Sequence, residues 1–210
     1  MSFGFTHLVV NGCSYTRCVG LKNPSKDGWP ALLANMLGVQ LIDLATPGGG
    51  NGAIFRTTLD FIHTNPLPNP LYLIAFSHSS RREEYLQSKG AYCNLHLNQL
   101  MTTNLEKILI SEYNQLEYSK NKLRYWLATV NTLKANNISY LTTDFMPDFD
   151  IDLSTHCPEL YAAVNNDSNR IEDFFKLCIG LPKLPCGHED LPAMQIIADY
   201  AYNEIKKRWH

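Results

Sequence analysis

The stretch His7-Leu-Val-Val-Asn-Gly-Cys-Ser14 joins an apolar, β-branched run to a tight turn. The run is typical of a strand that is buried on both faces, and Asn-Gly is a strong turn dipeptide. A strand that ends in this way places Ser14 just beyond its carboxyl end. Ser14 could cap the next segment, or it could be a nucleophile presented at the edge of a sheet.

The rest of the chain alternates between strand and helix patterns. Besides the first strand, segments 39–45, 71–77 and 138–144 have the composition of strands, and helical patterns cover 27–38, 51–63, 115–137 and 191–209. This alternation predicts an α/β fold, a three-layer α/β/α sandwich with a central parallel sheet. Ligands of such sheets bind beyond the carboxyl ends of the strands.

Composition narrows the class of protein. The 210 residues suit a single domain over 1–210. With 18 Lys and Arg against 20 Asp and Glu, the charge argues against nucleic acid or an anionic membrane surface as the main partner. No apolar run approaches the roughly 20 residues that span a bilayer, and the first residues do not read as a signal peptide. The oligomeric state is not indicated.

Cysteine usage and two irregular segments complete the outline. The six cysteines show no dense regular spacing, so we expect reduced thiols and a cytoplasmic protein. Segment 81–114 is polar, and we expect a loop with a short helix there, a candidate lid or insertion within the single domain. Segment 146–169 is also read as irregular.

The loops that follow the expected strands hold the residues that could carry chemistry. They are Gly12-Cys-Ser14, Thr46-Pro-Gly-Gly-Gly-Asn-Gly-Ala53 and Ser77-His-Ser-Ser-Arg-Arg-Glu-Glu84, together with Leu184-Pro-Cys-Gly-His-Glu-Asp190 ahead of the last helix. A doubly wound sheet could bring all four to one rim.

This order of motifs resembles the SGNH hydrolases, also called GDSL esterases and lipases, and in particular their divergent phage-type members. The family's first block is matched by Gly12-Cys-Ser14, and the Trp-Pro-x-Leu-Leu helix that often follows is matched by Trp29-Pro-Ala-Leu-Leu33. Its second block is matched by Gly48 and its last by His188. The resemblance covers nearly the whole chain.

The resemblance implies a flavodoxin-like fold and a serine esterase that hydrolyses a carboxylic ester through an acyl-enzyme on Ser14. His188 would be the base and then the acid. The backbone N–H groups of Ser14 and Gly48 would form the oxyanion hole. No cofactor and no metal are implied. The substrate would be a small-molecule or carbohydrate ester, with a carbohydrate O-acetyl group as one candidate.

The third block departs from the family pattern of Gly-x-Asn-Asp. The corresponding segment here begins at Ser77 and contains no Asn, so Ser79 takes the Asn position, with Ser77 and Asn51 as substitutes. The side chain of Ser79 or Asn51 would be the third oxyanion donor. Arg81 or Arg82 would bind an acidic group of the substrate. The polar, charged composition of this loop is equally typical of a solvated surface loop.

The last block departs as well, because the Asp that the family usually has three residues before its histidine is Pro185 here. The chain therefore shows a Ser-His dyad without a local carboxylate. Glu189 and Asp190 adjoin His188, and Asp144 and Asp148 follow the last predicted strand, but none stands at the expected place.

Two other hypotheses about the function remain open. The missing Asn and Asp favour a non-catalytic binding module that retains the fold. A zinc-stabilised structural domain is the other reading, because thiolate and imidazole ligands suit tetrahedral zinc. Its candidate ligands are His156, Cys157, Cys178, Cys186 and His188. Zinc would then occupy His188 and leave Ser14 without a base.

Overall fold

The central sheet has the parallel arrangement that the sequence predicts. The structure is a computed structural model and describes residues 3–86, 91–96, 115–146 and 151–210. Strands β1 (His7–Asn11), β2 (Gln40–Asp43), β3 (Pro70–Phe76) and β6 (Ser139–Asp144) pair in parallel in the order β2-β1-β3-β6. In this register Val10 lies beside Asp43 on one side and Leu73 on the other.

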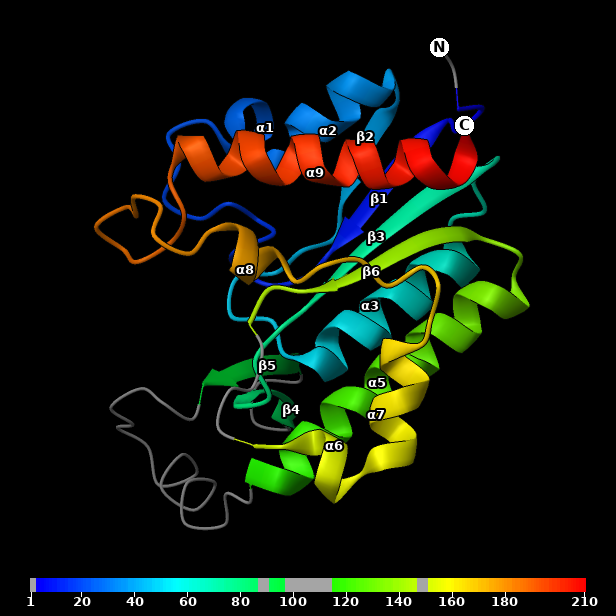
Figure 1. Ribbon diagram of the computed structural model, residues 1–210, viewed down its shortest axis with the longest axis vertical. Coiled ribbons are helices and arrows are strands. Elements are labelled where there is room, and N and C mark those ends of the chain that lie inside the picture. The colour runs from blue at the N-terminus through cyan, green and yellow to red at the C-terminus, as the bar shows by residue number, and fades with distance from the viewer. Residues whose placement is uncertain (1–2, 87–90, 97–114, 147–150) are drawn as a thin grey trace.

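Helices cover both faces of this sheet (Figure 1). Helices α1 (Pro24–Asp27), α2 (Trp29–Leu37) and α9 (Leu191–Trp209) form one outer layer, and α3 (Asn51–Thr64) and α5 (Gln115–Ala135) form the other. The α/β/α sandwich is thereby confirmed. Gly38 ends α2 with a φ of 68°, a left-handed conformation that glycine adopts at little cost.

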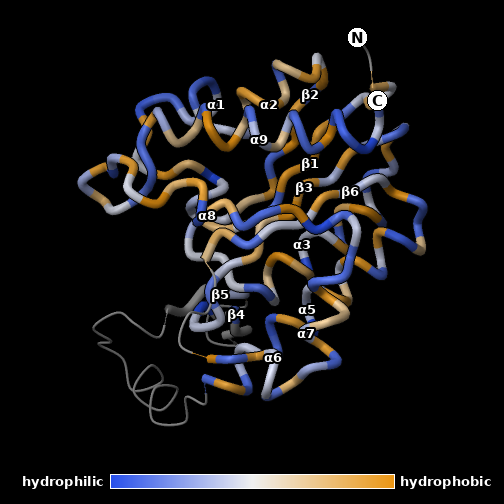
Figure 2. The backbone as a smooth tube through the Cα atoms, viewed as in Figure 1, coloured by the Kyte–Doolittle hydropathy of each residue, from blue (hydrophilic) through white to orange (hydrophobic). Residues whose placement is uncertain are grey.

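Alternate residues of the strands pack into two separate cores, as period-two geometry requires. Both faces are apolar, which explains why the strands show no polar alternation, and Figure 2 shows the strands as mainly hydrophobic segments of the backbone. The core beside α2 and α9 includes Leu8, Val10, Leu71 and Leu73, and the core beside α3 and α5 includes Val9, Tyr72, Ile74 and Phe76.

The expectation of a loop and a short helix from residue 81 onward is wrong for the part that the structure describes. Strands β4 (Arg81–Leu86) and β5 (Ala91–His96) form an antiparallel hairpin outside the main sheet. The hairpin is held against α3, because Glu83 pairs with Arg56 and the Arg56 guanidinium lies over the Tyr92 ring. The remainder of the expected lid, residues 87–90 and 97–114, lies outside the described residues.

The segment read as irregular contains short helices. They are α6 (Leu153–His156) and α7 (Pro158–Asn165), and α8 (Phe174–Leu177) follows. Asp152 caps α6 by accepting hydrogen bonds from the backbone of Ser154 and Thr155, and Pro158 occupies the first turn of α7, where its missing N–H costs nothing. Of the helices that the structure describes, none is long and apolar enough to cross a membrane.

Candidate active site

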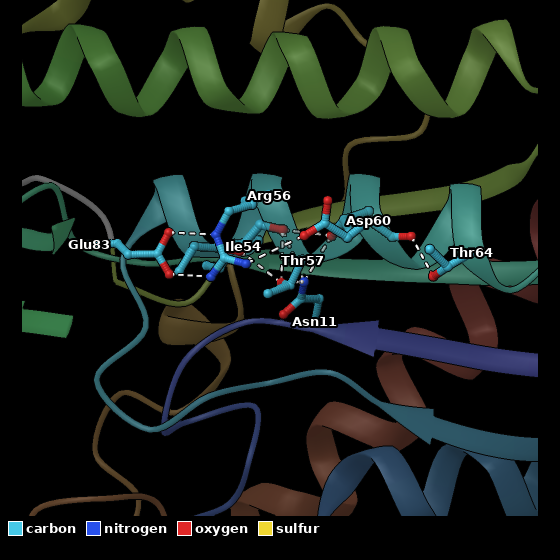
Figure 3. Close-up of polar contacts among 9 residues, drawn as sticks. Asn11, Ile54, Arg56, Thr57, Asp60, Thr64 and Glu83 are labelled. Atoms are coloured by element: carbon cyan, nitrogen blue, oxygen red, sulfur yellow. Dashed lines mark hydrogen bonds and ion pairs between the residues drawn. The ribbon is translucent and has the colours of Figure 1, made fainter. Parts of the chain in front are cut away.

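Asn11, the last residue of β1, holds the turn that carries Ser14 in place through its side-chain amide. The Asn11 Oδ1 accepts a hydrogen bond of 2.8 Å from the Gly12 N–H. Its Nδ2 donates to the carbonyl of Ile54 and to the hydroxyls of Thr57 and Thr58, at 2.8–3.0 Å. Figure 3 shows Asn11 reaching from β1 to this part of α3. The buried amide of Asn11 therefore connects the turn of Ser14 to α3.

Gly12 leaves no room for a side chain at this turn. A Cβ on Gly12 would collide with the Thr16 hydroxyl and would lie 2.9 Å from the Ala75 carbonyl oxygen. Beyond it, the Cys13 carbonyl accepts from the Arg17 N–H at 2.9 Å. Ser14 is buried, with 6% of its surface exposed. The turn thus packs against the carboxyl end of β3 and holds Ser14 at the sheet edge.

The loop after β2 lies against the same turn. The Thr46 N–H donates to the Gly12 carbonyl at 3.1 Å, and the Gly49 N–H donates to the Thr46 carbonyl at 2.8 Å. Gly48 has a φ of 75°, a left-handed conformation in which a Cβ would be strained. The predicted oxyanion glycine therefore belongs to a loop bonded directly to the turn of Ser14.

Asn51 and Ser79 meet the end of β3 in different ways. The Asn51 amide exchanges two hydrogen bonds with the Ser77 backbone, at 2.9 Å and 2.8 Å. It therefore braces this loop as well as lining the neighbouring pocket. The Ser79 hydroxyl accepts a 3.3 Å hydrogen bond from Ser119. Both residues are buried at the edge of the sheet where the sequence placed them.

His188 lies against the residue next to Ser14. Its ring packs on Tyr15 with centroids 4.7 Å apart. Both ring nitrogens are buried without a hydrogen-bond partner among the described residues, so the unliganded site has no Ser14–His188 hydrogen bond. Such bonds often tighten only when substrate is present.

The surroundings of His188 favour its neutral form. Burial lowers the pKa of the imidazole, and the positive charges of Arg81 and Lys183 lower it further. The Cys186 backbone opposes this shift without forming a hydrogen bond of ordinary geometry. A neutral imidazole can accept a proton.

Arg81, the first residue of β4, reaches the nucleophile position. Its Nη1 lies 3.5 Å from the Ser14 Oγ, and its guanidinium carbon lies 6.0 Å from the centre of the Tyr15 ring. Its side chain is 9% exposed. Arg81, Ser14, Tyr15 and His188, from three distant parts of the chain, therefore form one cluster.

Among the described residues, no carboxylate hydrogen-bonds to His188, and both oxygens of the buried Glu189 lack a hydrogen-bond partner. Glu189 lies 3.3 Å from the Lys183 ammonium, and Asp190 accepts from the Leu191 N–H at the start of α9. Asp144 lies 2.6 Å from the buried Lys122 ammonium. Asp148 is outside the described residues. The structure therefore gives His188 no carboxylate partner within the described part of the chain.

The structure does not support the hypothesis of a zinc-stabilised domain. Among the described residues, which include all five candidate ligands, no three His, Cys, Asp or Glu side chains are placed to hold a metal ion.

A polar pocket of about 270 Å³ adjoins this cluster through Arg81. Its walls come from the start of α3, from β4 and from α5. The lining residues are Asn51, Gly52, Ser79, Arg81, Glu83, Tyr118, Asn121, Lys122 and Tyr125. Amide, hydroxyl and charged groups dominate, so the pocket suits a small polar group better than a long hydrocarbon chain.

Solved structures resemble this chain along nearly its whole length. The esterase EstA from Pseudoalteromonas sp. matches with a TM-score of 0.61 and 17% identity over 96% of this chain and 97% of its own. A lipolytic protein of the G-D-S-L family from Desulfitobacterium hafniense DCB-2 matches with a TM-score of 0.58 and 14% identity, over 95% and 99%. The chain has the SGNH hydrolase fold.

A third similar structure is that of a carbohydrate esterase. The active site of this esterase has divergent catalytic and non-catalytic binding functions, and its structure matches with a TM-score of 0.61 and 12% identity over 99% of this chain and 66% of its own. Neither a family model nor a curated protein matches the sequence. At these identities the likeness establishes the fold, and the chemistry has to be argued from the site.

Sequence reasoning missed three groups of residues around this SGNH site. The role of Asn11 was missed because Asn11-Gly12 was interpreted only as a turn dipeptide, although a buried Asn at the end of a strand indicates a network of side-chain hydrogen bonds. Tyr15 carried no signal of its own. The α5 wall of the pocket was missed because Tyr118, Asn121 and Tyr125 belong to no recognisable motif.

Proposed function

We propose that this protein is a serine esterase that cleaves carboxylic esters through an acyl-enzyme on Ser14. The observation that carries the proposal is the cluster at the sheet edge, where His188 packs on Tyr15, the residue next to Ser14, and Arg81 lies 3.5 Å from the Ser14 hydroxyl. Ser14 Oγ attacks the ester carbon while His188 takes its proton. The leaving alcohol then takes that proton, and water releases the acid by the same steps in reverse.

The other roles in this mechanism are proposed from the arrangement of the loops around Ser14. The backbone N–H groups of Ser14 and Gly48 are the proposed oxyanion donors, supported by the hydrogen bonds that join their two loops through Gly12 and Thr46. Ser79 is the proposed polar contact at the pocket mouth, and Asn51 holds the backbone of this loop in place. Without a carboxylate, His188 is oriented by its packing on Tyr15.

The pocket supports a substrate with a short acyl group and a polar alcohol. Its lining offers hydrogen-bond donors and acceptors, and the two phenol rings of Tyr118 and Tyr125 are suited to the apolar face of a sugar. A carbohydrate O-acetyl group meets these requirements. The described cysteines are free thiols, in keeping with the cytoplasmic location expected from the sequence.

A fluorophosphonate probe tests the nucleophile without knowledge of the substrate. We expect an adduct on Ser14 of the wild-type protein, and no adduct in Ser14→Ala or His188→Ala, with all three proteins folded by circular dichroism. A matched control is His63→Ala, on a histidine at the far end of α3, which should label like the wild type. Absence of an adduct on folded wild-type protein would contradict the proposal.

The second candidate is a non-catalytic binding module, favoured by the unpartnered ring of His188 and the missing carboxylate. It predicts that acetylated sugars bind to wild type and Ser14→Ala with equal affinity and are not cleaved. Calorimetric titration together with detection of released acetate separates the two candidates. The esterase predicts acetate from the wild type alone.

A further inference from the structure

Arg81 is a buried cation that forms no ion pair with any residue that the structure describes. Its Nε has no hydrogen-bond partner among the described residues. Glu83, two residues along β4, is engaged by Arg56 through both of its oxygens, at 2.9 Å and 2.5 Å. Burying an uncompensated charge is costly, so this position suits a group that acquires negative charge.

The hairpin holds Arg81 in place without using its guanidinium. The Arg56–Glu83 fork joins β4 to α3 (Figure 3), and the Arg81 N–H donates to the His78 carbonyl at 3.2 Å. Two-point contact between Arg and a carboxylate fixes both distance and angle. Arg81 is therefore presented from an anchored strand, which lets it act on a reacting atom without large reorganisation.

The only hydroxyl that Arg81 contacts among the described residues is that of Ser14. The Nη1–Oγ separation of 3.5 Å is long for a hydrogen bond, so the interaction with the resting hydroxyl is weak. The carbon that Oγ attacks, and the oxygen bonded to it, would occupy the space about 3 Å from both groups. A contact that is weak at rest and strong toward developing charge accelerates the chemical step.

We propose that Arg81 is a catalytic residue whose Nη1–H donates to the oxyanion formed at Ser14, in place of the amide donor that the third block lacks. As the Ser14 Oγ–carbon bond forms, the carbonyl electron pair moves to the oxygen facing Arg81, and the serine proton goes to His188. When the pair returns, the bond to the leaving alcohol breaks and His188 gives that alcohol the proton. This inference rests on the proposed function.

This role differs from the binding of an acidic substrate group that the sequence suggested for Arg81. An oxyanion donor is needed for every ester, whereas an acid-binding residue matters only when the substrate carries an anion. The two roles therefore separate by kinetics on a neutral and an anionic ester, p-nitrophenyl acetate and mono-p-nitrophenyl succinate.

The test compares wild type with Arg81→Gln and Arg81→Lys, and with Arg124→Gln as the control. Arg124 is an exposed arginine of α5 that pairs with Glu117. We expect Arg81→Gln to lower kcat on both esters by about 10²–10³-fold with little change in KM. Arg81→Lys should recover part of this loss because it keeps a charged donor, and Arg124→Gln should behave as wild type.

Melting temperatures and phosphonate labelling keep the outcome interpretable. If Arg81→Gln is unfolded, the folded Arg81→Lys variant carries the test, and its kcat on the neutral ester must fall. Unchanged kcat on the neutral ester, with KM raised only for the succinate ester, would overturn the inference while leaving the esterase intact. Wild-type protein that neither takes the probe nor cleaves either ester would overturn the proposed function itself.

Discussion

The amide of Asn11 is expected to be worth a large part of the stability of this protein. Asn11→Ala removes the acceptor of the Gly12 N–H, which lies in a buried turn. An unsatisfied buried N–H costs about 1–3 kcal/mol. The Ile54 carbonyl keeps a second donor in Thr58, so the loss of the Nδ2 hydrogen bonds adds only about 1–2 kcal/mol.

The expected total is a loss of about 2–5 kcal/mol in the free energy of unfolding. For a protein of this size that corresponds to a melting temperature lower by roughly 4–20 °C. Urea unfolding followed by circular dichroism at 25 °C measures the free energy directly. The rate of fluorophosphonate labelling should fall as well, because the same amide positions the turn that carries Ser14.

Thr64→Ala is the matched control for the Asn11 variant. The Thr64 hydroxyl donates to the Asp60 carbonyl at 2.7 Å, at the exposed end of the same helix (Figure 3). Losing this bond strands no buried group, so the change should stay within about 0.5 kcal/mol. If Asn11→Ala also stays within that range, the amide does not anchor the turn and the reasoning fails.

Three further predictions concern the same end of the sheet. Gly12→Ala should lower the free energy of unfolding in urea by about 1–3 kcal/mol and slow fluorophosphonate labelling, because the new Cβ collides with the Thr16 hydroxyl. A variant as stable as the wild type would contradict this prediction. The value of kcat/KM should fall with a midpoint below pH 6.5, because burial lowers the pKa of His188 and keeps this base neutral above that pH. A midpoint above pH 6.5 would show that burial does not control the pKa of His188. Lys122→Met should cost about 3–5 kcal/mol by leaving the buried Asp144 carboxylate without this partner, and Lys122→Met with Asp144→Asn should recover most of it.

The sheet could be predicted because its signals are local. An apolar run such as Leu71–Phe76 is fully buried whichever helices cover it, so composition alone identifies the strand. The hairpin of β4 and β5 could not be predicted in this way. Its first strand begins Arg81-Arg-Glu-Glu, a sequence that suggests solvent, and the stabilising contact of Glu83 is with Arg56, far back in the chain.

The candidate site likewise combines residues that sequence patterns indicate with contacts that the sequence does not reveal. Ser14, Gly48 and His188 could be proposed as site residues because each follows a recognisable pattern, and the structure places their loops at one edge. The neighbours of His188 could not be deduced from sequence. Its packing on Tyr15 and the approach of Arg81 depend on how a strand-end turn, a hairpin and the loop before α9 meet, and no local pattern encodes that meeting.

The electrostatics of this site explain how a dyad without a carboxylate can work. In a triad the carboxylate stabilises the imidazolium that forms in the transition state, whereas here Arg81 raises the energy of that cation. The same charge lowers the energy of the oxyanion, and Coulomb energy grows as distance shrinks. Arg81 lies 3.5 Å from the Ser14 Oγ, beside which the proposed oxyanion forms, and it makes no hydrogen bond to His188, so under the proposed mechanism we expect the gain at the oxyanion to exceed the cost at the base. Stabilisation of the oxyanion would then take the place of stabilisation of the imidazolium, and removing Arg81 should lower kcat even though it makes His188 easier to protonate.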